Sequence, residues 1–191
     1  RTNFAGEPRP VLTFEDESSN SRTFALLGVG GSYDLTENLS LYGNISQNFR
    51  SITFSDLRVV NPNFQLDSTI TDENGYNADL GVRGTVGNWL NIDVSVFLMR
   101  YNDRIGLVLK ERSTTLLRTN IGNSRHYGLE SFIEISVWDL FGVSKPDSRL
   151  TLFSNLALTE ATYIESERLA ILNRRVEYVP EVMWRAGVNY Q

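Results

Sequence analysis

The sequence contains no cysteine and a single histidine, His126. The missing cysteine excludes a disulfide, a thiolate nucleophile and a cysteine-based metal site. With one histidine we expect neither a histidine-based metal site nor a catalytic triad. The lack of cysteine does not separate a reducing cytosol from a cysteine-poor cell envelope.

Long apolar runs and a basic face are also absent. No run reaches the roughly 18 residues that a membrane-spanning helix needs, which leaves a β-barrel open because barrel strands alternate. The 18 Lys and Arg against 23 Asp and Glu give a net charge of -5, which opposes nucleic-acid binding. No signal peptide begins at Arg1, so an outer-membrane or secreted protein would be present here in mature or truncated form.

Two long stretches of alternating residues flank Gly87-Asn88 and predict a hairpin. Apolar residues occupy every second position from Tyr76 to Val86 and again from Leu90 to Leu98, with polar residues between them. Each stretch runs for about ten residues, the length of a tilted membrane strand, whereas strands of soluble sheets average about five or six. The pattern favours a membrane barrel, and a long hairpin in a large soluble β protein remains the alternative.

The rest of the chain predicts further strands of the same kind. We interpret 1–22 as a loop, Phe49–Asn74, where the alternation breaks, as a long functional or mobile loop, and 110–115, 138–148 and 161–177 as further connections. The predicted strands number seven: Thr23–Tyr33, Leu39–Asn48, Tyr76–Val86, Leu90–Leu109, Leu116–Val137, Arg149–Glu160 and Tyr178–Tyr190.

Short connections fall at one end of these strands and long ones at the other, which is typical of outer-membrane barrels. Aromatic residues at both ends suggest two girdles. The short-turn girdle would contain Tyr33, Trp89, Trp138, Phe141 and Tyr190, and the distal one Phe49, Tyr76, Tyr101, Tyr127, Tyr163 and Tyr178. Bacterial single-chain barrels have even strand numbers, so seven strands predict a segment of a larger barrel.

Four motifs carry a family resemblance. Thr119–Glu130, TNIGNSRHYGLE, fits the pattern N-x-G-x(4,5)-G-[VL]-E found in barrels of TonB-dependent outer-membrane receptors. Three other segments occur in the same order as in that family: LYGNISQNFR with the following residues to Phe54, NPNF followed by NADLGVRG, and Val179-Pro180 followed by GVNY. Together they cover nearly the whole chain, and Arg118–Glu130 is most similar to ferric-dicitrate-type receptors.

The resemblance implies an all-β fold, an antiparallel transmembrane β-barrel segment of seven strands out of about 22. Residues 1–191 would belong to one barrel domain, without the plug domain and the last strands. The implied function is TonB-coupled uptake of a ferric siderophore or ferric-citrate-like chelate across the outer membrane of a Gram-negative bacterium. The implied partners are the lipid bilayer, the protein's own plug and the TonB complex. The ferric chelate would be cargo, and no cofactor is expected on this segment.

The alternation places six charged residues on the predicted barrel interior: Asp79, Arg83, Asp93, Glu130, Glu134 and Arg185. By resemblance they would face the plug, so we expect charge pairing there and no catalysis. His126 is predicted to be a solvated strand residue near the outer rim.

Three arginines at outer strand ends or loops, Arg50, Arg104 and Arg118, are candidate contacts for an anionic chelate, since guanidinium groups form bidentate hydrogen bonds with carboxylates. Arg118 shares the inward parity of Glu130 provided that no bulge separates them. Ordinary solvated loop arginines are the alternative. For the whole protein, a passive porin, a barrel enzyme and a soluble binding module remain alternatives.

Overall fold

The computed structural model describes residues 23–58, 63–110, 113–143, 145, 147–166 and 168–191. The predicted loop at 1–22, the Asn61-Pro62 pair of the family motif and Pro146 lie outside the described residues. Seven strands form one antiparallel sheet in the order β1-β2-β4-β5-β6-β7-β8. Their bounds are Gly28–Thr36 (β1), Leu39–Arg50 (β2), Glu73–Val86 (β4), Leu90–Leu109 (β5), Leu116–Ser136 (β6), Leu150–Glu165 (β7) and Val182–Tyr190 (β8).

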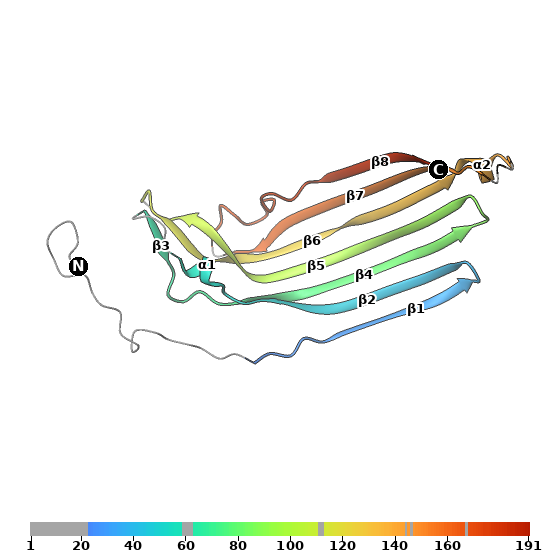
Figure 1. Cartoon of the computed structure of the whole chain (residues 1–191). Helices are drawn as coiled ribbons and strands as arrows, with labels where there is room; N and C mark the ends of the chain where they lie inside the picture. Colours follow the sequence, from blue (N-terminus) through green and yellow to red (C-terminus); the bar gives the residue numbers. More distant parts are fainter. Residues whose placement is uncertain (1–22, 59–62, 111–112, 144, 146, 167) are drawn as a thin grey trace, which may run out of the picture.

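The two ends of the sheet differ as the sequence predicts. The β1–β2 and β4–β5 turns lie at one end, together with helix α2 (Val137–Leu140), and the longer connections lie at the other (Figure 1). Gly87 adopts a φ of +58° in the β4–β5 turn, a conformation that glycine reaches without a steric penalty. We call the opposite end the distal end. Of the described helices, none is long and apolar enough to cross a bilayer.

The segment between β2 and β4, which the sequence predicts to be one long loop, contains regular structure. It contains helix α1 (Phe54–Leu57) and strand β3 (Phe64–Leu66), and β3 pairs in parallel with the start of β6. Strands β2 and β4 also extend further towards the distal end than predicted, since their pairing continues to Arg50 and Glu73. The described sheet therefore has eight strands, seven in the main path and β3 at its distal end.

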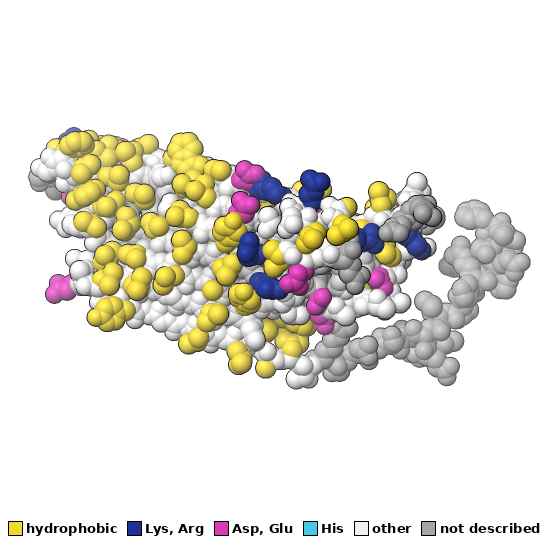
Figure 2. All heavy atoms as spheres, turned by 180° about the vertical axis from the view of Figure 1, so that it is seen from behind, with side chains coloured by type: hydrophobic (Ala, Val, Ile, Leu, Met, Phe, Trp, Pro, Cys, Tyr) yellow, Lys and Arg dark blue, Asp and Glu magenta, His cyan; other side chains and the backbone are white. Residues whose placement is uncertain are grey.

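The register aligns apolar side chains into rows that cross the sheet on one face, which we call the outward face. One such row runs Leu41, Val82, Val94, and the next runs Leu80, Val96, Leu129, Leu158, Val182. Several members are more than half exposed, for example Leu80 at 53% and Val182 at 59%. Hydrophobic side chains cover this face at the short-turn end, and charged side chains gather further along (Figure 2).

The height of this apolar band matches a bilayer. On β5 it extends from Leu90 to Leu98, and Arg100 follows as the next outward residue. Eight residue steps of about 3.4 Å, on a strand tilted by about 40°, give a height of about 21 Å, close to the apolar band of about 25 Å on outer-membrane barrels. Since β5 continues to Leu109, its distal part extends beyond this band.

A small apolar core lies at the distal end instead of between two layers. It consists of Ile121, Ala161, Tyr163 and Val176, with Val108, Ile171 and Val179 packed against it. Tyr163 is 1% exposed and donates a hydrogen bond of 2.8 Å to Glu177, so its predicted place in an aromatic girdle is wrong. Tyr76 and Tyr127, in contrast, lie on the outward face in register with the edge of the apolar band.

Candidate functional site

All six charged residues predicted for the interior lie on the face opposite the apolar band. The register pairs Arg83 with Asp93 directly across β4 and β5, and the other four fall on the same parity in their strands. Tyr42 donates a hydrogen bond of 2.7 Å to Asp93, and its ring lies 5.2 Å from the Arg83 guanidinium carbon. Asn44 donates one of 2.6 Å to Asp79.

This polar face carries a hollow that is lined by residues of β2, β5, β6, β7 and β8. This open hollow of about 550 Å³ is lined by Tyr42, Asp93, Glu130 and Arg185, among others. Its walls combine carboxylates and a guanidinium group with the apolar side chains of Phe132, Leu156, Ala157, Met183 and Trp184. An open surface with both polar and apolar groups suits contact with another protein segment. That these residues contact a plug remains a prediction.

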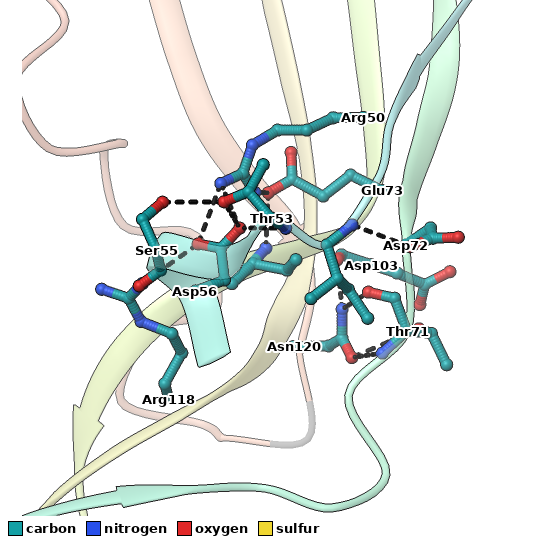
Figure 3. Close-up of polar contacts among 12 residues, drawn as sticks. Arg50, Thr53, Ser55, Asp56, Thr71, Asp72, Glu73, Asp103, Arg118 and Asn120 are labelled. Carbon is teal, nitrogen blue, oxygen red and sulfur yellow. Dashed lines mark hydrogen bonds and ion pairs between the residues drawn. The ribbon is translucent and has the colours of Figure 1, made fainter. Parts of the chain in front are cut away.

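The second candidate region is a cluster of ion pairs at the distal end, centred on Asp56 of α1. Asp56 is 4% exposed, and two of the three predicted ligand arginines, Arg50 and Arg118, reach it (Figure 3). Arg50 lies 2.9 Å from one carboxylate oxygen and Arg118 lies 3.0 Å from the other. Thr53 adds hydrogen bonds from its backbone N–H (3.0 Å) and its hydroxyl (2.7 Å).

These contacts change the titration of Asp56. Burial alone would raise the pKa of Asp56, but the hydrogen bonds from Thr53 and the charge of Arg50 outweigh it, so the pKa lies below its usual value. Burial likewise acts to lower the pKa of Arg50, whereas Glu73 and Asp56 raise it, with a net upward direction. Arg50 and Asp56 therefore stay charged and paired at neutral pH.

Glu73 extends the cluster to the β-sheet. It accepts a hydrogen bond of 2.6 Å from Arg50 and another of 2.9 Å from the backbone N–H of Ile105. Arg50 thus bridges two carboxylates, one on α1 and one on β4. Neither Asp56 nor Glu73 follows from the strand alternation, but Thr53-Phe54-Ser55-Asp56 fits the S/T-x-x-D/E signature of a helix start, which could have indicated α1.

A second set of contacts fixes the far half of the same segment. Asp67 accepts hydrogen bonds of 2.6 Å from Thr119 and 2.9 Å and 2.7 Å from Thr69, and these lower its pKa to about 2. Asn120 accepts one of 2.8 Å from the backbone N–H of Thr71. With the parallel β3–β6 pairing, they hold the described parts of segment 51–72 against β6.

The third predicted arginine, Arg104, is not in this cluster. Asp103 precedes it with a φ of +55°, the register shifts on both sides of Arg104, and the guanidinium carbon lies 5.8 Å from the Tyr163 ring centre. Within the described part of the chain, Arg104 has no carboxylate at ion-pair distance. Of the three arginines, it is the one whose charge is not balanced by an ion pair among the described residues.

Arg118 does not keep the parity of Glu130. Opposite the step from Arg104 to Ile105 on β5, β6 advances by two residues, from Gly122 to Asn120, and Gly122 adopts a φ of +133°, so β6 has a bulge between Arg118 and Glu130. The prediction that Arg118 shares the inward parity of Glu130 required that no bulge separates them, and this requirement is not met. Its guanidinium group packs over Phe64 at 5.5 Å and donates to the Ser55 carbonyl at 3.1 Å.

His126 is buried, so its predicted solvation is wrong. It is 8% exposed, its Nε2 lies 3.2 Å from the Ser124 hydroxyl, and its ring meets Tyr101 edge-on at 5.2 Å. The covering Tyr101 comes from the neighbouring strand, which a local pattern does not indicate. Among the described residues, no group of three His, Asp or Glu side chains could hold a metal ion.

Comparisons with known proteins agree with this architecture. The family model "TonB dependent receptor-like, beta-barrel" matches residues 2–191. The copper transporter OprC has a similar fold with a TM-score of 0.65 and 17% identity, and so has the unliganded ferric citrate transporter FecA, with 0.62 and 19%. The ferric yersiniabactin uptake receptor FyuA from Yersinia pestis gives 0.58 and 18%.

At these identities the likeness concerns the fold alone. The alignments cover 86%, 85% and 85% of this chain, but only 23%, 22% and 22% of the three structures. This chain thus spans between a fifth and a quarter of each. A comparison with curated proteins gave no match.

Proposed function

Since the chain belongs to the TonB-dependent receptor β-barrel family, we propose that it forms wall and distal loops of an outer-membrane receptor that imports a scarce metal chelate. The single observation that carries the proposal is the two-faced sheet, apolar over a bilayer-sized band on one face and charged on the other. In such a receptor the apolar band contacts lipid, and the charged face lines an interior that a plug fills.

The proposed role is capture and passage of a ligand without bond making. The polar face would contact the plug, and TonB would supply the energy that moves it. The residues of this chain would therefore act as binding and positioning groups, with the chelate as cargo and no resident cofactor. We propose a ferric siderophore or a ferric-citrate-like chelate as the cargo, since the proteins of similar fold include a ferric citrate transporter, a ferric yersiniabactin receptor and a copper transporter.

Within this proposal we assign the three arginines two different roles. Arg50 and Arg118 already bind Asp56, so they hold α1 in place, and using them for a ligand would leave a buried carboxylate unpaired. Arg104 has no such partner among the described residues and is held over an aromatic ring. It is therefore the arginine that we propose to contact an anionic chelate.

Uptake of ⁵⁵Fe-citrate and of ⁵⁵Fe-siderophores by cells with this receptor as their only one tests the proposal. We expect accumulation of one chelate that stops when TonB is deleted or when a protonophore is added. A passive porin would continue to equilibrate its solute under both treatments, and that result would refute the receptor proposal.

The Arg104→Ala variant tests the role of that residue. It should weaken chelate binding by about tenfold or more, the cost of one charge-assisted contact. The matched control Arg83→Ala removes an arginine from the interior face nearer the short turns, and it should leave chelate binding at the surface unchanged. Equal affinities of the Arg104 variant and the unaltered receptor would remove Arg104 from the ligand site.

A further inference from the structure

Arginine side chains form a row on the outward face immediately beyond the apolar band. Arg100 of β5 and Arg125 of β6 are direct cross-strand partners. The partner of Arg125 on β7 is Thr162, which forms an isolated antiparallel β-bridge with Arg175. The preceding outward row on β5 and β6 is Leu98 and Tyr127. These guanidinium groups therefore lie at the level where a bilayer ends and its phosphate groups begin.

The charges of this row are unevenly compensated. Arg100 forms an ion pair of 3.0 Å with Glu165, and Arg175 forms one with Glu181. Arg125 is exposed, its guanidinium carbon lies 5.4 Å from the Tyr127 ring centre, and no ion pair to it occurs among the described residues. Like charges directly opposite each other on a sheet are destabilising, so an anion between Arg125 and Arg100 would relieve their repulsion.

A hollow opens on the same face beside this row. Its volume is about 740 Å³, and its walls include Val96, Leu129, Leu158 and Val182 from four neighbouring strands. Tyr127, Glu160, Arg175 and Glu181 lie at it as well. The apolar walls are continuous with the lipid-facing band, whereas the charged groups lie towards the distal end.

We propose that this surface is a binding seat for a phosphorylated lipid of the outer leaflet. The lipid phosphate binds Arg125 and reaches Arg100, and an acyl chain occupies the apolar hollow. Guanidinium groups suit this task because their planar fork binds phosphate oxygens in pairs. Two carboxylates also lie at the hollow. Arg175 neutralises Glu181, and Glu160 lies opposite Tyr127, one row closer to the apolar band than Arg125. The phosphate therefore approaches Arg125 from the distal side, away from Glu160. The inference rests on the proposed outer-membrane placement but not on transport.

The test uses the full natural receptor in nanodiscs of phosphatidylcholine that contain a small fraction of spin-labelled phosphatidic acid. The unaltered receptor should enrich the labelled lipid in its motionally restricted shell. The double variant Arg100→Gln/Arg125→Gln should lose about 30-fold of that preference, since each substitution removes one cation at the membrane surface. The control Arg83→Gln/Arg185→Gln removes two arginines from the opposite face and should keep the preference.

Equal lipid preference in the outward double variant and the unaltered receptor would overturn the proposal. Inorganic phosphate distinguishes a lipid phosphate from free phosphate as the bound anion. If millimolar inorganic phosphate displaced the labelled lipid, the site would bind free phosphate, and that result would also overturn the proposal. If the variant does not fold, the unaltered receptor must lose preference as salt is raised, and a salt-independent preference contradicts the seat. A receptor that inserts but imports no chelate would fail only the proposed transport.

Discussion

Replacing Asp56 with asparagine should release segment 51–72 from the sheet while the barrel wall stays folded. Asparagine has nearly the same size, but it is neutral and presents an amide NH₂ group where the carboxylate accepts. That group would face the donors of Thr53 or Arg50, which now lie 2.7 to 3.0 Å from the carboxylate. Arg118 would lose its charged partner as well.

The size of the effect follows from the burial of the partners. Removing one member of a fully buried ion pair costs about 3 to 5 kcal/mol. The side chains of Arg50 and Arg118 are 44% and 22% exposed, so water screens part of this loss. We expect about 2 kcal/mol, which increases the open fraction of the segment about 30-fold.

Hydrogen–deuterium exchange of the receptor in detergent measures this opening. Peptides covering 51–58 and 63–72 should exchange about 30-fold faster in the Asp56→Asn variant, and peptides of β5 near the short turns should not change. The control is Asp34→Asn, whose carboxylate accepts a hydrogen bond of 2.6 Å from Ser40 at the opposite end. Unchanged exchange at 51–58 would refute the view that Asp56 holds this segment.

Two further predictions concern the faces of the sheet and the hydrogen bonds of Asp67 that hold segment 51–72. Val94→Arg places a charge in the apolar band and should lower the free energy of barrel unfolding by about 2 to 4 kcal/mol, measured as a lower urea midpoint in lipid. The control Ser95→Arg places the same charge on the polar face and should cost much less. Equal urea midpoints of the two variants would contradict the assigned faces. Because the pKa of Asp67 is lowered to about 2, its contribution is complete above the usual value of about 4 and is lost as the pH falls towards 2. An environment-sensitive dye on Ser68→Cys should report opening in that window, and Thr119→Val should move the opening to higher pH; an unmoved transition would exclude this hydrogen bond as the cause.

The strands and their faces could be predicted from the sequence because alternation is a local property. The ends of β5 and β6 and the turn at Gly87 agree with the alternation, and the register follows once the two strands are joined by that turn. The six interior charges fall on one face for the same reason. β8 begins later than predicted, at Val182, because Tyr178 has a φ of +61° and Pro180 has no N–H for a sheet.

The distal cluster could not be predicted in the same way, because its contacts join residues far apart in the sequence. Asp56 meets Arg118, and β3 pairs with Leu116 through only three residues, too few to show a period. The bulges at Asp103 and Gly122 invert the parity of the residues beyond them. Alternation therefore identified Arg104 and Arg118 as distal but could not say which of them was already paired.

Labelling of single cysteines in whole cells tests the proposed receptor most directly, because in an outer-membrane barrel the long distal connections face the medium and the short turns face the periplasm. Ser68→Cys lies in the distal segment and Asn88→Cys in the β4–β5 turn. We expect an impermeant maleimide to label Ser68→Cys in intact cells and to label Asn88→Cys only after the outer membrane is permeabilised. Labelling of Asn88→Cys with protection of Ser68→Cys in intact cells would contradict this orientation.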